Sequence, residues 1–184
     1  MRLQLVLRDL EDVYRHWHWV PHPTDSILSG IVRLIRLVRR ISRVSGKRVE
    51  RLKARARRLL DDAQSDFQEG FYDVACFHAE QAAQLFVKGI ILELFGREYA
   101  GHGLRELVGY ASRLLGDAGY TDLAERVSEY VRQSRSILID LESAYIDARY
   151  GEVNYDAEVA GRLLDGARAL MGLLEEVERI VKLG

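Results

Sequence analysis

Apolar residues between positions 26 and 67 recur at intervals of three and four, with one gap at Ser45. On a helical wheel of about 100° per residue, they stay on one side of the helix over the whole span. This shared phase favours one long helix. Gly46, which weakens a helix interior by about 1 kcal/mol, leaves a hairpin broken at that residue as the alternative. The apolar positions are Ile27, Ile31, Leu34, Val38, Ile41, Val49, Leu52, Ala56, Leu59, Ala63 and Phe67.

Four further helical stretches follow, and glycines stand at several of their ends. Prolines occur only at Pro21 and Pro23, so no later residue lacks a backbone N–H donor. No segment alternates in the manner of a strand, and the connections are short enough for antiparallel neighbours. We therefore expect an all-α fold, an up-and-down antiparallel helical bundle with an N-terminal helical extension. The expected helices are residues 71–95, 103–115, 121–149 and 156–183.

Charge is distributed unevenly along the chain, although the formal net charge is only −1. Residues 1–60 hold 15 Lys/Arg and 5 Asp/Glu, a net of +10, whereas residues 61–184 hold 12 and 23, a net of −11. Eight of the cations share one helical face, where like charges repel one another. This basic face is expected to be solvated, to pack on the acidic part of the same chain or of a second copy, or to bind phosphate groups. It consists of Arg33, Arg36, Arg40, Arg43, Lys47, Arg51, Arg55 and Arg58.

Cysteine content and the start of the chain bear on the compartment. The single cysteine, Cys76, has no internal partner for a disulfide, which suits a reducing compartment. The N-terminal apolar run is broken at Arg8 and Asp9, and residues 34–41 carry three arginines. Neither segment has the apolar length of a secretion signal or a membrane span. A cytoplasmic location without membrane attachment is expected.

Three polar residues stand in line on the otherwise apolar helix expected over residues 71–95. His78, Gln81 and Lys88, with Leu85 between them, are spaced by three, four and three residues and share one face. One interpretation is that His78 and Gln81 hydrogen-bond a neighbouring helix or a second subunit. The other is a polar groove in which cations meet a phosphate and a tyrosine stacks on a base. The predicted nucleotide- or RNA-binding groove consists of His78, Gln81, Lys88, His102, Tyr145 and Arg149.

Three blocks of sequence resemble the HEPN domain family. Residues 59–89 read LLDDAQSDFQEGFYDVACFHAEQAAQLFVKG, which is similar to the signature helix pair of that family. HGL at residues 102–104 and AYIDARY at residues 144–150 continue the resemblance, which covers residues of about 50–182. It implies a HEPN-like helical bundle over residues 49–184, preceded by a basic N-terminal helical extension over residues 1–48.

The resemblance also bears on catalysis. HEPN ribonucleases use an arginine followed four to six residues later by a histidine, usually paired across a dimer. Here Asn154 stands where that histidine would follow Arg149, and no other arginine of residues 121–149 supplies the motif. An amide does not shuttle a proton near neutral pH. The expectation is a non-catalytic protein, with no assigned catalytic residue and no cofactor.

Small HEPN proteins are often encoded beside a minimal nucleotidyltransferase. The resemblance therefore implies a homodimer that binds a nucleotide or an RNA-related ligand as one half of a two-component, toxin–antitoxin-like system. Two alternatives stay open. One is a metal-independent ribonuclease with a degenerate motif, using Arg149 with Asn154 or His102. The other is an architectural homo-oligomer whose basic helices cover acidic bundle surfaces without a small ligand.

A histidine- and tryptophan-rich string, HWHWVPH, occupies residues 16–22. Imidazoles are good metal ligands, yet no carboxylate or cysteine is grouped with these histidines. We interpret Trp17 and Trp19 as docking the N-terminal segment onto the bundle, and no metal site is predicted. Phosphate-binding, dinucleotide-binding and zinc-protease motifs are absent from the sequence.

Overall fold

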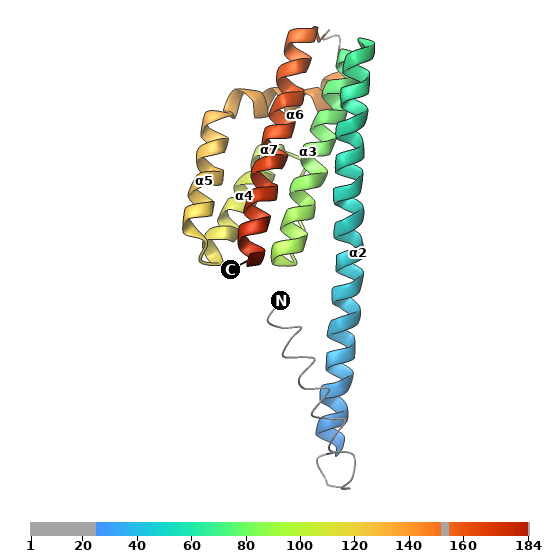
Figure 1. The fold of residues 1–184 in the computed structure, drawn as a ribbon, viewed down its shortest axis with the longest axis vertical. Helices are drawn as coiled ribbons and strands as arrows, with labels where there is room; N and C mark the ends of the chain where they lie inside the picture. The colour runs from blue at the N-terminus through green and yellow to red at the C-terminus, as the bar shows by residue number, and fades with distance from the viewer. Residues whose placement is uncertain (1–24, 152–154, 184) are drawn as a thin grey trace. The chain divides into compact units, whose positions relative to one another are not determined.

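A computed structural model describes residues 25–151 and 155–183, with side chains described for residues 46–147, 151 and 155–183. Within these residues the chain forms helices and no strand, so the all-α prediction is confirmed (Figure 1). None of these helices combines the length and the apolar character that crossing a bilayer requires. The helices are α2 (Asp25–Glu69), α3 (Tyr72–Phe95), α4 (Leu104–Asp117), α5 (Thr121–Gln133), α6 (Arg135–Tyr150) and α7 (Ala157–Leu183).

Helix α2 continues through Gly46, so residues 25–69 form one helix and the alternative of a hairpin is wrong. A Cβ added at Gly46 would meet nothing, so this glycine serves no close approach. The chain divides after Gly46 into two units. The second unit, Lys47–Gly184, contains the helical bundle.

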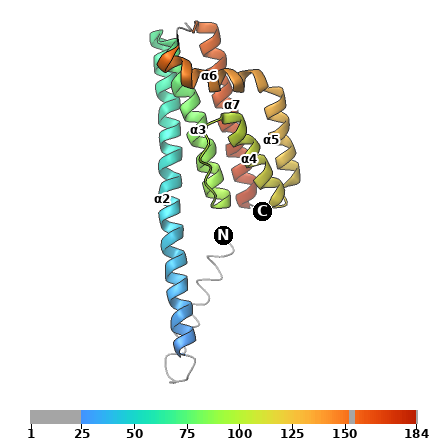
Figure 2. The ribbon, with the colours of Figure 1, turned by 180° about the vertical axis from the view of Figure 1, so that it is seen from behind.

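Helix α3 is the central helix of the bundle and packs against α4, α6 and α7. Its apolar residues are distributed around the helix, as expected where neighbours cover several sides. Phe86, Ile90 and Ile91 are fully buried on it, and four alanines between residues 75 and 83 are buried as well. Small side chains at these positions let neighbouring helices approach α3 closely. Figure 2 shows α4 and α5 on the far side of the bundle from α2.

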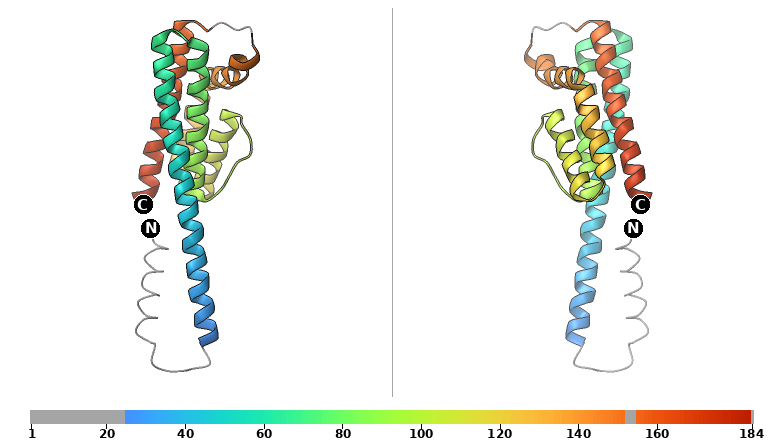
Figure 3. Two further views of the ribbon diagram at one scale, coloured as in Figure 1. Left: turned by 90° about the vertical axis from the view of Figure 1, so that its right-hand side faces the viewer. Right: turned by 90° about the vertical axis from the view of Figure 1, so that its left-hand side faces the viewer.

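The loop between α3 and α4, residues 96–103, returns along the bundle before α4 begins (Figure 3). It starts at Gly96, whose φ of 63° lies in the left-handed region that favours glycine. The Gly96 N–H donates to the carbonyl oxygen of Leu92 and closes the last turn of α3. Because the loop runs back, its end lies beside the middle of α3 rather than beyond the end of that helix.

The prediction of one helix over residues 121–149 is wrong, because the chain turns at Ser134. Its φ of −97° and ψ of 16° depart from helical values, and α6 leaves in a different direction from α5 (Figure 3). The turn brings both helices onto α7 at Gly166. Tyr130 on α5 donates from its hydroxyl to the Gly166 carbonyl oxygen at 3.2 Å, and a Cβ at Gly166 would overlap Ile137 on α6.

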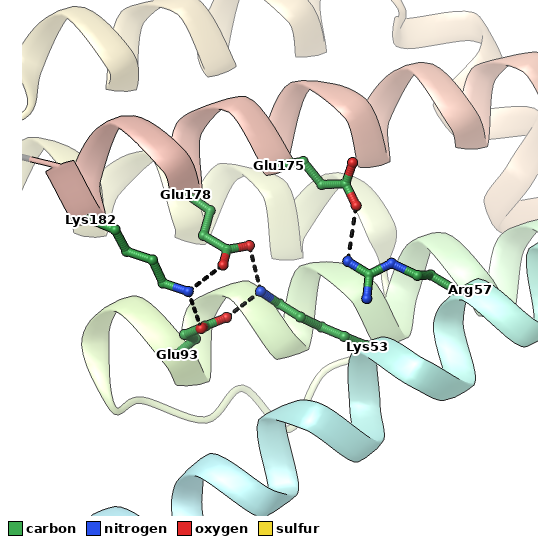
Figure 4. A network of polar contacts seen from close by, with 6 residues as sticks. All are labelled: Lys53, Arg57, Glu93, Glu175, Glu178 and Lys182. Carbon is green, nitrogen blue, oxygen red and sulfur yellow. Dashed lines mark hydrogen bonds and ion pairs between the residues drawn. The ribbon is translucent and has the colours of Figure 1, made fainter.

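A network of ion pairs joins α2, α3 and α7 (Figure 4). The ammonium of Lys53, which is only 7% exposed, contacts the carboxylates of Glu93 and Glu178. Lys182 pairs with the same two carboxylates from the solvent side. A buried charge is tolerated only when it is paired and hydrogen-bonded, as Lys53 is here.

Candidate functional site

A polar row runs along α3 at a spacing of four residues, from the buried Glu80 and Gln84 to the partly buried Lys88. Glu80 is 1% exposed, and its carboxylate accepts hydrogen bonds from Gln81 Nε2 at 2.5 Å and Gln84 Nε2 at 2.8 Å. Gln84 Oε1 in turn accepts from Lys88 Nζ at 3.1 Å. The predicted row contains Leu85, whereas in the structure Gln84 makes the connection to Lys88.

The returning loop adds His102 to this row. Gln84 Nε2 also donates to the His102 carbonyl oxygen at 3.0 Å, which fixes the orientation of the amide because a carbonyl only accepts. Gln84 Oε1 therefore faces His102 Nδ1, 3.3 Å away. The exposed His102 ring lies parallel to the ring of Tyr145 on α6, with an interplanar angle of 8° and centroids 6.4 Å apart. We call these four residues, Lys88, Gln84, His102 and Tyr145, the Lys88–Tyr145 line.

Aromatic contacts continue from Tyr145 towards the start of α3. The Phe77 ring lies 6.3 Å from that of Tyr145 and 5.7 Å from that of His78, centroid to centroid. His78 Nδ1 is 2.6 Å from Asp66 Oδ2 on α2. His78 thus connects α3 to α2, which is the contact with a neighbouring helix that one interpretation of the sequence predicted. Gln81 differs, because its hydrogen bond stays within α3.

Burial controls the protonation of three groups on α3. It raises the pKa of Glu80 above the ordinary 4.5, although hydrogen bonds from Gln81 and Gln84 oppose it. Burial also lowers the pKa of Lys88 below 10.5, against the attraction of Glu80. Burial first, and Asp73 second, raise the pKa of the Cys76 thiol to about 12, which keeps it protonated and unreactive at neutral pH.

A shallow depression of about 350 Å³ lies at the start of α4. It is lined by Gly103, Arg105, Glu106 and Glu142. The Glu142 carboxylate accepts from the backbone N–H of Arg105 at 2.7 Å and from Arg105 Nε at 2.8 Å. It therefore already occupies the position that an anion would take at this helix N-terminus. Of the predicted groove residues whose side chains are described, none lines this depression.

The structure brings His78, Lys88, His102 and Tyr145 into one series of contacts through residues the prediction omitted. Gln84 and Phe77 provide the links, and Glu80 holds Gln84. The spacing of Glu80, Gln84 and Lys88 by four residues was a usable signal for a shared face. The Arg149 side chain, Asn154 and the string at residues 16–22 lie outside the described residues.

On the predicted basic face, Lys47, Arg51, Arg55 and Arg58 are exposed on α2. Arg58 pairs with Asp62, four residues further along the helix, at 2.6 Å. The side chains of the other four members lie outside the described part of the chain: Arg33, Arg36, Arg40 and Arg43.

A family model and two solved structures are similar to this chain. The family model of the HEPN domain matches residues 49–177. TT1696 from Thermus thermophilus is 27% identical, with a TM-score of 0.51, over 70% of this chain and 97% of its own. ST0689, an archaeal HEPN homologue, is 22% identical, with a TM-score of 0.49, over 71% of this chain and 97% of its own. No curated protein matches. Because the family model matches well over half of the sequence, the chain belongs to the HEPN domain family.

Proposed function

We propose that this chain is a non-catalytic HEPN protein that binds a nucleotide or an RNA-related ligand at the Lys88–Tyr145 line. The observation that supports this is the hydrogen-bonded connection from a lysine ammonium through Gln84 to an exposed imidazole parallel to a tyrosine ring. An ammonium suits a phosphate, and aromatic rings suit a base. The line offers both within a few contacts.

Lys88 is the candidate phosphate ligand. Among the described residues it forms no ion pair with a carboxylate, and its hydrogen bond goes to the neutral amide oxygen of Gln84. Partial burial removes water from the charged ammonium, and this loss of hydration lowers the pKa of Lys88. A phosphate would bring a negative charge into direct contact with the ammonium and act as a strong hydrogen-bond acceptor for it.

His102 is the candidate base platform. Its ring is exposed and parallel to the ring of Tyr145. Gln84 contacts both the ring Nδ1 and the backbone carbonyl oxygen of His102. Stacking of a base on an aromatic side chain contributes about 1–3 kcal/mol. The contacts to Gln84 hold the imidazole in place before the ligand arrives, which reduces the entropy lost on binding.

Calorimetric titration with ATP, adenosine and tripolyphosphate separates the two parts of this site. For Lys88→Met we expect ATP and tripolyphosphate to bind at least about tenfold more weakly, with adenosine unchanged. For His102→Ala we expect weaker binding of ATP and adenosine, with tripolyphosphate unchanged. Arg162→Gln, which removes an exposed cation of α7, is the matched control. Equal heats of binding for the wild type and all variants would contradict ligand binding at the Lys88–Tyr145 line.

The non-catalytic part of the proposal needs a separate assay. Labelled RNA incubated with an excess of pure protein is expected to stay intact, because Asn154 replaces the histidine of the family motif. Cleavage that persists through further purification and is lost in Arg149→Ala would support the ribonuclease alternative instead.

The proposal also includes a homodimer and a minimal nucleotidyltransferase as partner, on the basis of family membership. Sedimentation equilibrium gives the oligomeric state, and a monomer at micromolar concentration would contradict the homodimer. A tagged chain purified from its natural host is expected to retain a nucleotidyltransferase in stoichiometric amount. Recovery of the chain without one would contradict the partnership.

A further inference from the structure

Six of the seven cations whose side chains are described on α2 fall into two groups, and the seventh, Arg58, pairs with Asp62 of the same helix. Those that face or flank the neighbouring helices are each paired with a carboxylate. Arg48 pairs with Glu98 at 2.5 Å, and Arg57 with Glu175 at 3.1 Å. Lys53 sits between two carboxylates in the network of Figure 4. On this side of the helix, carboxylates from the rest of the bundle neutralise the positive charge of α2.

The second group is the exposed row of Lys47, Arg51 and Arg55. Among the residues whose side chains are described, no carboxylate pairs with any of them, and all three are exposed. A spacing of four residues places successive cations about 6 Å apart along the axis, on one side of the helix. The buried residues Val49 and Ala56 lie on the opposite side. The row thus presents unmatched, evenly spaced positive charge to solvent.

We infer that this row binds the phosphate backbone of a single-stranded nucleic acid. Repeated phosphates along a strand neutralise a linear array of cations that otherwise repel one another. In the sequence, further arginines between Arg33 and Arg43 also recur at spacings of three or four residues. This site is separate from the Lys88–Tyr145 line and does not depend on a nucleotide binding there.

An acidic protein surface is a weaker match for the row. Stable protein interfaces have an apolar core surrounded by a polar rim. The exposed large apolar residues of the described chain are Phe71, Ile146 and Leu183, and none of them lies on α2. The neighbouring exposed residues on this side of the helix, such as Glu50 and Ala54, are charged or small. The row therefore offers charge without an apolar anchor, which is sufficient for sequence-independent contacts to a phosphate backbone.

Salt-dependent binding of the full chain to a labelled oligouridylate of about 16 nucleotides tests this inference. Fluorescence anisotropy is measured between about 50 and 200 mM salt. Each phosphate neutralised on a single strand contributes about −0.7 to the slope of log K against log salt concentration. The double variant Arg51→Gln/Arg55→Gln is therefore expected to reduce the magnitude of that slope by about 1.4. Arg162→Gln/Arg179→Gln, which removes two exposed cations of α7, is expected to leave it unchanged.

Further arms identify the ligand and separate the two sites. A deoxyoligonucleotide of the same length is expected to bind equally well, because a backbone contact does not require the 2′-hydroxyl. Tighter binding of the RNA than of the DNA strand would still support the inference and would identify the ligand as RNA. The double variant Arg51→Gln/Arg55→Gln is expected to keep the wild-type ATP affinity, because neither arginine belongs to the Lys88–Tyr145 line.

Three outcomes would overturn the inference. The first is no binding to either strand, and the second is an equal change of slope in the row variant and in the α7 control. The third is binding to anionic lipid vesicles that exceeds binding to the strands, which would assign the row to a membrane surface. Circular dichroism of the double variant checks that the helices persist, because the row is exposed and its loss should not unfold them.

Discussion

Glu80 and Gln84 are joined across one turn of α3, with Glu80 Oε1 accepting a hydrogen bond of 2.8 Å from Gln84 Nε2. The same carboxylate accepts from Gln81, so both of its oxygens are occupied although the side chain is almost fully buried. Together with the His102 carbonyl oxygen, Glu80 determines which way the Gln84 amide points. The positions of the Lys88 ammonium and the His102 ring relative to each other therefore depend on a carboxylate that no ligand would touch.

We predict that Glu80→Gln destabilises the protein. The new amide keeps one accepting oxygen and places its NH₂ group against the NH₂ group of either Gln81 or Gln84, and a buried donor left without an acceptor costs about 1–3 kcal/mol. The loss is measured as the difference in free energy of unfolding from urea denaturation. Glu158→Gln on α7, which is exposed, is the matched control and is expected to change stability little. Equal stability of wild type and Glu80→Gln would contradict this role.

The wild type and Glu80→Gln are also expected to differ in pH dependence. The pKa of Glu80 in the folded protein lies above 4.5, so between 4.5 and that value the folded state holds the proton that the unfolded state has released. The free energy of unfolding of the wild type therefore falls as pH rises through this window, and Glu80→Gln has no such contribution. The stability advantage of the wild type is expected to be larger at acidic than at neutral pH. A stability difference between the wild type and Glu80→Gln that increases with pH would contradict this prediction.

Removal of the Lys53 ammonium is expected to be the most damaging single change in the ion-pair network. Lys53→Met leaves the carboxylates of Glu93 and Glu178 facing each other without their buried cation, at a cost of about 3 kcal/mol or more. Lys182→Met removes a half-exposed cation from the same carboxylates and is expected to cost about 1 kcal/mol or less. Similar losses in the two variants would show that burial does not distinguish these lysines.

Acid should weaken the wild type more than Lys53→Met. Burial acts to raise the pKa of Glu178, but hydrogen bonds from Lys182 and Lys53 hold it below the ordinary 4.5. The stability from this group is present above 4.5 and is lost as pH falls through the folded pKa, because the unfolded state takes up the proton first. Without Lys53 the pKa of Glu178 is less depressed, so the loss of unfolding free energy in acid is expected to be smaller.

Two glycines of α7 are expected to respond to alanine in opposite directions. A Cβ at Gly166 would overlap Ile137 Cγ2, so Gly166→Ala forces α6 away and is expected to cost about 1–3 kcal/mol. A Cβ at Gly172 would meet nothing, so Gly172→Ala is expected to stabilise the helix by about 0.5–1 kcal/mol. Thermal and urea unfolding measure both changes. In an Ile137→Ala background the cost of Gly166→Ala should shrink; an unchanged cost would contradict the overlap as its cause.

Local pattern was enough to predict the helices other than the division of residues 121–149 into α5 and α6, and it was enough to indicate the family. The apolar period of α2 keeps its phase through Gly46, and the structure has one helix there. Gly96 ends α3 where the sequence placed it, since a left-handed residue terminates a helix by its own conformational preference. These properties depend on neighbours within one or two turns, so they can be read from the chain alone.

Contacts between distant segments determined the turn at Ser134, the arrangement of the Lys88–Tyr145 line and the burial of Glu80. Ser134 lies in a stretch with helical periodicity on both sides, and the chain turns there because α5 and α6 both reach Gly166 on α7. The Lys88–Tyr145 line needs the returning loop to bring His102 beside Gln84, eighteen residues earlier in the chain. Glu80 is buried only because several helices surround α3, and a glutamate in a sequence is otherwise expected at the surface. Sequence periodicity determined which residues share a helix face, and tertiary packing determined which of those faces meet.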